Sequence, residues 1–365
     1  MTSPNTPTPS SPSSPNCLLL YCRGGFEKEC AAEILDRTLA LGMAGYAKAK
    51  PETGFVVFVP NESAMLATAR HKLRFDSLIF ARQRVFAHGP VADLPPEDRV
   101  TPLLGHARAL AERFSDCFME TADTNEAKEL SVFVRKFAGP FRRALERENL
   151  IGGLGAPRLH VFFLDSATAY VGWSDPRDAS PWPMGIPRLK SPRSAPSRST
   201  LKLEEAFLVF VRDPESELKP GMTAVDLGAA PGGWTWQLAR RHIRTLAIDN
   251  GRIDAALLES GVVEHLKADG FRYRPAKPVD WLVCDMVEQP ARIAALVAEW
   301  LALGLCRKAI FNLKLPMKKR YEEVLRCRAI IEARAAKAGI ECRLAFKQLY
   351  HDRAEITGYL SRPDR

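Results

Sequence analysis

The stretch AVDLGAAPGGWTWQL, residues 224–238, decides the fold class of the chain. A short apolar run is followed by a loop that contains Gly228, Pro231, Gly232 and Gly233. A helical segment begins directly after this loop. A strand, a glycine-rich loop and a helix in this order form the turn with which α/β proteins bind nucleotides. We therefore expect a ligand of nucleotide type at this loop.

Strand-like and helical segments alternate from this loop to the end of the chain. The expected strands are residues 223–230, 245–250, a short run within 262–270, then 279–286, 308–316, 342–351 and 355–361. Strands separated by helices predict a parallel, doubly wound sheet. The last two strands have no helix between them, which predicts a hairpin at one edge. In such sheets ligands bind at the carboxyl ends of the strands.

The loop excludes two common ligand classes. Its pattern is G-x-x-P-G-G, whereas dinucleotide-binding loops carry G-x-G-x-x-G, and no G-K-[ST] follows. Pro231 also removes an N–H that a phosphate would use. The loop instead suits S-adenosylmethionine, which carries no phosphate and needs close approach of the backbone.

Three aspartates at successive strand ends strengthen this interpretation. Asp249 is placed to bind ribose hydroxyls and Asp269 to bind the adenine amine, while Asp285 faces the methionine and its sulfonium cation. The alternative is that these residues form turns or cap helices.

Two lysines and two carboxylates are expected at the same edge. Lys202 precedes the first strand, Asp285 and Lys314 end two others, and Glu355 begins the last. A partly buried lysine beside another cation has a lowered pKa and can accept the proton of a ribose hydroxyl or hold that hydroxyl in line. The alternative for Lys314 is a surface lysine in a basic turn. Methylation of a base carbon needs a cysteine nucleophile, and Cys284 lies inside a strand.

The region before the linker predicts two small α/β blocks that act as scaffold or binding surface. The first has strands at 17–22, 54–60 and 77–86 and helices at 26–41 and 62–73. The second has a long helix at 102–119, a strand at 130–137, a helix at 139–149 and a hairpin of 158–165 and 168–174.

Residues 174–200 contain six prolines and predict a linker, because proline lacks an N–H and fixes φ. Residues 188–202 contain no Asp or Glu and five basic residues, namely Arg188, Lys190, Arg193, Arg198 and Lys202. The segment is therefore a solvated connection, a basic arm that contacts nucleic-acid phosphates, or both.

Composition limits the class of protein. A chain of 365 residues exceeds one ordinary core, and a net charge of +9 is consistent with a polyanionic partner. The eight cysteines form no C-x-x-C pair, so we expect reduced, buried thiols, no metal site and a cytoplasmic protein. No apolar run is long enough to span a membrane. Residues 1–16 lack a signal-peptide pattern, and their Pro, Ser and Thr content predicts a disordered tail.

With these motifs in hand, the chain resembles the ribosomal RNA large subunit methyltransferase M family. The resemblance extends from residue 18 to residue 357, and its most specific pieces are MGIPRLK (184–190), APSRSTLKLEEAF (195–207), AVDLGAAPGGWT (224–235), VCDMVEQPARIAAL (283–296) and IFNLKLPMKKRYEEV (310–324). It implies a ferredoxin-like domain at 17–90, a THUMP domain at 91–173, the linker at 174–200 and a Rossmann-like, class I methyltransferase domain at 201–365.

The resemblance also implies a function and its residues. The implied activity is methylation by S-adenosylmethionine of a cytidine ribose 2′-oxygen in 23S ribosomal RNA or its precursor. We separately expect a monomer with no membrane partner. The implied cofactor contacts are Ser199, Ala230, Pro231, Gly232, Gly233, Asp249, Asp269 and Asp285. Lys314 is implied as proton acceptor, and the set Lys202, Asp285, Lys314 and Glu355 is similar to that of heat-shock-type ribose methyltransferases. Ala230 departs from the cysteine that relatives often carry, which a position contacting through its backbone should tolerate.

Two alternatives remain at this point. One is a methyltransferase that acts on a different RNA or on a base atom. The other is an RNA-binding protein that keeps the cofactor as a structural ligand, against which the intact set of four charged residues argues. In the THUMP region, Arg135, Lys136, Arg142, Arg143 and Arg147 offer an RNA-binding surface. Arg143 and Arg147 share one helix face.

Overall fold

The computed structural model describes residues 14–363 and divides at the Ile186–Pro187 bond into two compact units. Residues 1–13 of the predicted tail lie outside the described residues. Within residues 14–363, no helix is both long enough and apolar enough to cross a membrane. The same residues contain no group of three or more His, Cys, Asp and Glu side chains arranged to hold a metal ion.

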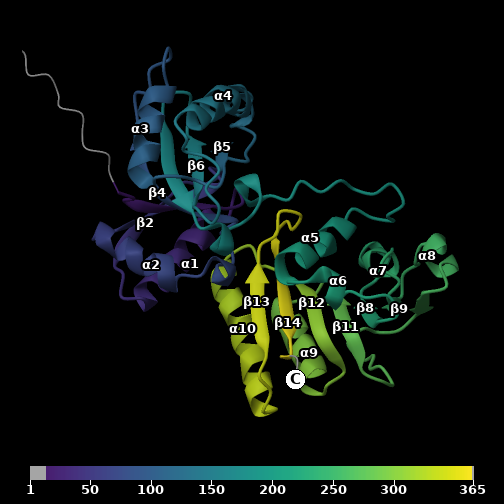
Figure 1. The fold of residues 1–365 in the computed structure, drawn as a ribbon. Coiled ribbons are helices and arrows are strands. Elements are labelled where there is room, and N and C mark those ends of the chain that lie inside the picture. Colours follow the sequence, from purple (N-terminus) through teal and green to yellow (C-terminus); the bar gives the residue numbers. More distant parts are fainter. Residues whose placement is uncertain (1–13, 364–365) are drawn as a thin grey trace, which may run out of the picture. The chain divides into compact units, whose positions relative to one another are not determined.

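The first unit is built on one seven-stranded sheet with the order β2-β3-β1-β4-β7-β6-β5 (Figure 1). Its strands are β1 (Cys17–Tyr21), β2 (Gly45–Ala49), β3 (Phe55–Pro60), β4 (Gln83–Val91), β5 (Cys117–Thr121), β6 (Arg158–Phe163) and β7 (Ala169–Ser174). Its α-helices are α1 (Glu27–Ala40), α2 (Leu66–Lys72), α3 (Val100–Leu110) and α4 (Lys128–Arg147). The boundary predicted at residue 90 falls inside β4, so the two predicted blocks share a continuous sheet.

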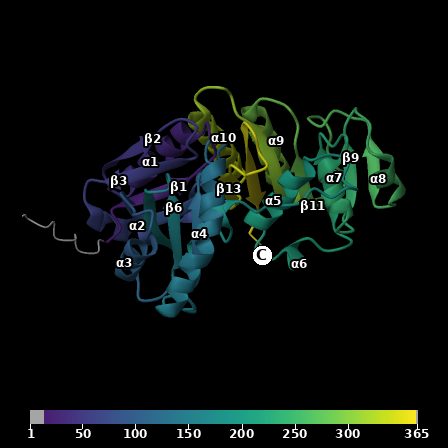
Figure 2. The same ribbon diagram turned by 90° about the horizontal axis from the view of Figure 1, so that it is seen from above.

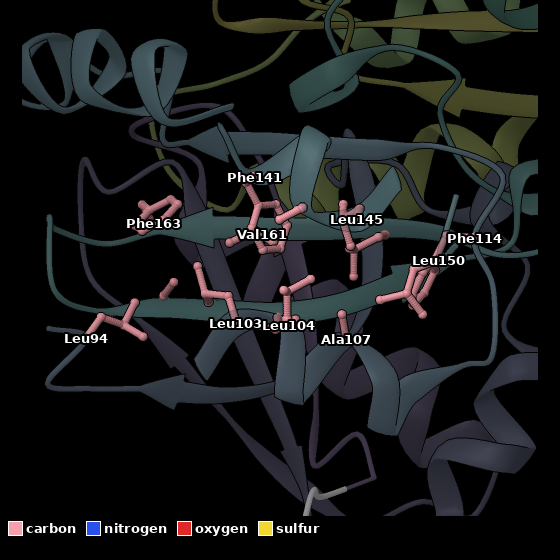
Figure 3. Close-up of a cluster of buried hydrophobic side chains, with 14 of the residues drawn as sticks. Leu94, Leu103, Leu104, Ala107, Phe114, Phe141, Leu145, Leu150, Val161 and Phe163 are labelled. Atoms are coloured by element: carbon pink, nitrogen blue, oxygen red, sulfur yellow. The ribbon is translucent and has the colours of Figure 1, made fainter. Parts of the chain in front are cut away.

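Helices α3 and α4 cover the β5-β6-β7 part of this sheet through one apolar cluster (Figure 3). Leu103 and Leu104 of α3 and Phe141 and Leu145 of α4 meet Val161 of β6 there. Four of these five side chains have no measurable exposure, so the cluster is a dry core. Burying each such side chain contributes on the order of 2 kcal/mol, which makes this cluster a main source of stability for the unit.

Two sequence predictions in this region were wrong. Residues 130–137, predicted as a strand, form the first half of the 20-residue helix α4. The apolar residues Phe133, Phe137 and Phe141 recur every four positions and stack along one helix face, which outweighs the break suggested by Pro140. The helix predicted at 102–119 ends at Leu110, and its last three residues belong to β5. Strand β2 was not predicted, because it is a mostly exposed edge strand with little apolar pattern.

A buried polar network ties the first half of the predicted linker to this sheet. The Glu120 carboxylate accepts hydrogen bonds from the Tyr21 hydroxyl at 2.7 Å and the Met184 backbone N–H at 2.6 Å. The His160 ring lies 2.8 Å from Glu120 through Nδ1 and 2.8 Å from the Ser174 hydroxyl through Nε2. Burial, followed by the nearby Glu120 charge, raises the pKa of Tyr21. Residues 174–186 are therefore part of the first unit rather than a free connection.

The second unit is a seven-stranded sheet with the order β10-β9-β8-β11-β12-β14-β13. Its strands are β8 (Thr223–Leu227), β9 (Arg244–Ile248), β10 (Val263–Leu266), β11 (Val279–Cys284), β12 (Cys306–Lys314), β13 (Arg343–Lys347) and β14 (Glu355–Ser361). The first five are parallel to one another, and β14 runs antiparallel between β12 and the edge strand β13. The predicted doubly wound sheet with an edge hairpin is confirmed.

Helices cover both faces of the second sheet (Figure 2). They are α5 (Thr200–Phe210), α6 (Pro214–Glu217), α7 (Gly233–Ala239), α8 (Ala255–Glu259), α9 (Pro290–Ala302) and α10 (Arg320–Lys337). Helices α9 and α10 pack together on one face, and α5 and α7 pack on the other, where Phe207 and Trp281 meet edge to face. The C-terminal half of the chain is thus a Rossmann-like fold whose loops at one sheet edge are free to carry a site.

We expect the Glu120 network to stabilise the first unit. Glu120→Ala removes the acceptor of several buried donors and should lower the free energy of unfolding by about 3–5 kcal/mol. Tyr21→Phe removes one of these bonds and should cost about 1–3 kcal/mol. Hydrogen-exchange mass spectrometry of peptides that cover 158–186 measures the effect in the full chain. The exposed Glu126→Ala is the control, and protection equal to wild type in Glu120→Ala would contradict the assignment.

Candidate active site

Chemical groups from five strands meet at one edge of the second sheet. Asp249 and Asp285 directly follow the parallel strands β9 and β11, and Lys314 is the last residue of β12. Glu355 begins β14, and because that strand is antiparallel, its first residue lies at the same edge. The glycine loop leaves the sheet here from β8. The edge therefore combines the loop with most of the predicted site residues.

Two lysines and two carboxylates interlock at the centre of this edge. Lys314 Nζ donates to Asp285 Oδ1 at 2.8 Å and also to Glu355 Oε2. Lys202, in the first turn of α5, contacts Glu355 Oε1 and lies 3.6 Å from Asp285 Oδ2. Each lysine thus faces both carboxylates. The side chain of Glu355 is only 5% exposed, whereas that of Lys314 is 27% exposed and accessible to a substrate.

The electrostatics of Lys314 differ from the sequence prediction. Burial opposes its positive charge, but Asp285 and Glu355 outweigh that effect and raise the pKa of Lys314 above the ordinary lysine value. Lys202 was predicted to lower this pKa, and the carboxylate contacts prevail instead. Burial likewise opposes the charge of Glu355, but Lys202 and Lys314 leave its pKa below the ordinary value. The two lysines and two carboxylates therefore form one mutually paired set, and Lys314 is an ammonium at neutral pH.

A second layer of polar side chains lies beneath these ion pairs and was not singled out from the sequence. Asn312 Nδ2 donates to Asp285 Oδ1 at 3.0 Å. The Thr357 hydroxyl lies 2.8 Å from Asn312 Oδ1 and 3.0 Å from Asp352 Oδ2. Asn312, Thr357 and Asp352 are almost completely buried. The available signal was the alternation in FNLK and EITG, which puts Asn312 and Thr357 on the same face as Lys314 and Glu355; Asp352 lies in the loop before β14 and had no such signal.

The glycine loop is held in place by Asp249. Its carboxylate accepts the Ala230 backbone N–H at 3.1 Å and the Gly251 backbone N–H at 2.7 Å. Ala230 takes part in this contact through its backbone N–H. Gly228 and Gly232 both have positive φ, at 77° and 116°.

The glycines of the loop are close-packed against the protein. A Cβ at Gly228 would lie 2.6 Å from the Met286 side chain, and one at Gly232 would collide with Leu257. A Cβ at Gly233 would meet the hydroxyl of Ser199, which bonds to that of Ser197 at 2.6 Å. These three positions thus require glycine for backbone conformation or packing.

Asp226 is a further candidate that sequence reasoning passed over, although it lies in the stretch that decides the fold. It is 1% exposed, and its Oδ2 accepts the Thr235 hydroxyl at 2.7 Å, while Oδ1 is buried without a hydrogen-bond partner. Burial, followed by the neighbouring charge of Asp285, raises the pKa of Asp226 to about 7. An orphaned carboxyl oxygen beside the glycine loop fits a polar ligand such as S-adenosylmethionine at this edge.

Asp269 has a more ordinary environment. Its side chain is about half exposed, accepts the Phe271 backbone N–H at 2.8 Å and pairs with Arg272 at 3.6 Å. These contacts are those of a turn-forming aspartate, the alternative raised from the sequence. Its position three residues after β10 still places it at the same edge as Asp249.

Comparison with known proteins assigns the chain to a family. Residues 195–357 match the FtsJ-like methyltransferase model, residues 16–85 the RlmM ferredoxin-like domain, and residues 98–175 the N-terminal model of ribosomal RNA large subunit methyltransferase M. A protein named ribosomal RNA large subunit methyltransferase M from Methylococcus capsulatus is 66% identical over 347 residues, covering 95% of this chain and 98% of the relative.

Two further relatives carry the same name. The protein from Cellvibrio japonicus is 54% identical and covers 94% of this chain and 99% of its own length. The protein from Cronobacter sakazakii is 49% identical and covers 95% of this chain and 96% of its own length. Identities of this size over almost the whole length of both chains show common structure and descent. The chain therefore belongs to the ribosomal RNA large subunit methyltransferase M family.

Proposed function

We propose that this methyltransferase transfers the methyl group of S-adenosylmethionine to the ribose 2′-oxygen of a cytidine in 23S ribosomal RNA, with Lys314 as the group that contacts the reacting hydroxyl. The observation that carries the proposal is the interlocked set of Lys202, Asp285, Lys314 and Glu355 beside the glycine loop. Family membership supports the reaction class.

The proposed cofactor contacts follow the loop and the strand ends. The backbone of residues 230–233 and the Ser199 side chain would hold the cofactor, with Asp249 at its ribose, Asp269 toward its adenine and Asp285 near its sulfonium. When bound, the cofactor supplies an activated methyl group on a cationic sulfur. Asp226 adds a buried carboxyl group under the loop, whose unpartnered oxygen can accept one more hydrogen bond.

The proposed chemistry needs Lys314 in its neutral form. In that form Lys314 Nζ would accept the hydroxyl proton while the 2′-oxygen takes the methyl group that bound S-adenosylmethionine would supply. Asp285 and Glu355 hold that proton strongly in the structure. Lys202, whose Nζ lies 3.6 Å from Asp285 Oδ2, weakens the hold of Asp285 on this proton, because the carboxylate then interacts with two positive groups. Lys202 keeps Glu355 in position through its direct contact.

The alternative of methylation at a base carbon lacks its nucleophile at this site. Cys284 is completely buried within β11, and burial raises the pKa of its thiol to about 12. A thiol in that state does not supply the thiolate that attack on a base requires. This observation argues against a base carbon as the methyl acceptor.

RNA binding is proposed to depend on exposed lysine and arginine side chains in each unit. In the first unit, Lys136, Arg143 and Arg147 of α4 are exposed, while Arg142 is paired with Asp116 at 3.2 Å. In the second unit, Lys190, Arg193 and Arg198 are exposed. Lys202, predicted as part of this basic run, instead faces two carboxylates. The N-terminal region at 91–173 is proposed to act as the THUMP module, in a cytoplasmic monomer.

Asp249 is expected to be required for cofactor binding. Asp249→Ala removes a charge-assisted hydrogen bond and the anchor of the loop, which should weaken S-adenosylmethionine binding roughly 10- to 100-fold. Isothermal titration calorimetry measures the change. Glu259→Ala, an exposed carboxylate on α8, is the matched control and should bind as the wild type does. Equal affinity in Asp249→Ala would remove this residue from the cofactor site.

Lys314 is expected to control the rate and not cofactor affinity. Lys314→Ala should cut single-turnover methylation on the order of 10²-fold or more, the size of a general-base contribution. Lys314→Arg should fail as well, because guanidinium stays protonated. The exposed Lys318→Ala is the control.

The pH dependence tests the same role. Because the pKa of Lys314 is raised, the neutral fraction is small at neutral pH and grows about tenfold per pH unit below that pKa. The wild-type rate should therefore rise with pH. A rate independent of pH, a near-normal Lys314→Ala enzyme, or a methyl group found on the base would reject this mechanism.

RNA affinity is expected to fall steeply with salt. If about 4 phosphates are contacted, a fourfold increase in salt should weaken binding roughly 50-fold by counterion release. Replacing Arg143 and Arg147 with Gln should make the plot of log binding constant against log salt concentration less steep, by about 0.7 for each lost phosphate contact. Fluorescence anisotropy with a labelled rRNA fragment measures both effects, with exposed Lys277 and Lys337 changed to Gln as the control. A slope unaltered by the arginine changes would place the RNA elsewhere.

A further inference from the structure

Two exposed apolar side chains lie in the loops that leave the active edge of the second sheet. Val287 follows β11 and is 88% exposed, and Met317 follows β12 and is 92% exposed. Among the described residues, Leu154 is the one large apolar side chain that is more exposed. Single exposed apolar residues are common on protein surfaces, but these two share one sheet edge with the candidate active site. Their joint position indicates a common role.

The two loops begin at residues that are in contact at the centre of the site. Lys314 Nζ lies 2.8 Å from Asp285 Oδ1. Val287 comes two residues after Asp285, and Met317 comes three residues after Lys314. Because an extended chain advances at most about 3.5 Å per residue, these backbones lie within about 7 Å and 10 Å of Asp285 and Lys314. Both exposed side chains are therefore close enough to contact a nucleotide whose hydroxyl group meets Lys314.

In each loop, an apolar residue that comes earlier in the chain is turned into the protein. Met286 packs beneath the glycine loop, since a Cβ at Gly228 would lie 2.6 Å from its side chain. Leu315 is 8% exposed, and its backbone N–H donates to the Ala354 carbonyl at 2.9 Å. Each loop thus buries one apolar side chain as its anchor and presents a second one to solvent. The fold of the second unit does not require the exposed pair.

We propose that Val287 and Met317 form an apolar contact for the base of the target nucleotide, which holds the ribose of that nucleotide against Lys314. This inference rests on the proposed methyl transfer to a ribose and adds two substrate contacts to it. The face of the base is the extended apolar surface of a nucleotide, because the ribose carries hydroxyl groups and the phosphate carries a charge. Enzymes that act on one nucleotide commonly pack its base between aromatic or apolar side chains.

An apolar contact of this kind suits a reaction at the ribose. A target nucleotide whose base lies on these loops loses stacking with its neighbours in the RNA, and that loss costs free energy. Burial of Val287 and Met317 against the base offsets part of the cost. Methionine adapts well to a flat surface, because its side chain is unbranched and flexible. Phosphate contacts elsewhere provide most of the RNA affinity, so the base contact should govern the rate of methylation rather than the affinity.

Replacement of the two side chains by serine tests the contact. Val287→Ser and Met317→Ser should each lower the single-turnover rate on the order of 5-fold, the size expected when about half of the burial of an apolar side chain is lost. The Kd for RNA and the Kd for S-adenosylmethionine should keep their wild-type values. Val287→Ile and Met317→Leu retain an apolar surface and should retain the wild-type rate. Leu303→Ser is the control, because Leu303 is exposed but precedes β12 at the opposite edge of the sheet.

An RNA with an abasic target nucleotide provides the decisive comparison. This nucleotide keeps the ribose and its 2′-hydroxyl but lacks the base, and ligation can place it in full-length 23S rRNA once the methylated position is mapped. The wild-type rate should fall roughly 10- to 25-fold on this RNA, whereas the double serine variant should be slowed far less. Slowing of both enzymes by the same factor would overturn the proposal, because the two side chains would then act on something other than the base. Weakened cofactor binding in the serine variants would overturn it as well.

The position of the methyl group separates this proposal from the proposed function. Nuclease digestion and mass spectrometry of RNA methylated by the wild type show whether the ribose or the base carries the methyl group. A methyl group on the base rejects the ribose mechanism and, with it, the use of the contact to position a ribose. A methyl group on the ribose combined with wild-type rates of both serine variants rejects the base contact alone. In that case the exposed pair would be left to contact a protein partner.

Discussion

The site depends on the mutual neutralisation of two lysines and two carboxylates at one edge of a parallel sheet. Glu355 is almost completely buried, and a buried charge is tolerated only when it is paired and hydrogen-bonded. Both lysines contact it, and both also face Asp285. Removing any member leaves an uncompensated charge near the glycine loop. This mutual dependence ties together α5, β11, β12 and β14, which are far apart in the sequence.

The fold of the second unit could be predicted from the sequence because most of its strands are short and apolar and alternate with segments of helical periodicity, while the last two strands have no helix between them. The first unit was harder. Residues 130–137 alternate Val132 and Val134 with larger side chains, which resembles a strand, but their aromatic residues have the spacing of a helix and pack on Phe163. In residues 130–137, packing against residues distant in the sequence therefore favoured the helical spacing over the strand-like alternation. The continuity of β4 with β7 also depends on contacts distant in the chain, which local patterns do not contain.

The sequence predicted that the candidate site residues meet at one sheet edge, but it predicted their electrostatics only in part. Strand ends are visible in a sequence, so Asp249, Asp285 and Lys314 could be identified there. The direction of the pKa shift of Lys314 could not be predicted from the sequence. It depends on whether the charge nearest to Lys314 is Lys202 or a carboxylate, and the sequence does not give distances of a few ångströms. Asp226 and the buried layer that contains Asn312 were not singled out for a related reason. A single polar residue inside an apolar strand produces no recognisable sequence pattern, and its role is seen only when its hydrogen-bond partners are known.

The register between β12 and β14 connects the two layers of the site. Lys314 is opposite Glu355, and Asn312 is opposite Thr357. Side chains alternate between the faces of a strand, so residues two apart share a face, and both pairs project to the same side of the sheet. A slip of one residue would send one strand's side chains to the other face and separate both pairs at once. The antiparallel insertion of β14 next to β12 is therefore the feature that brings both pairs together at one charged edge of the sheet.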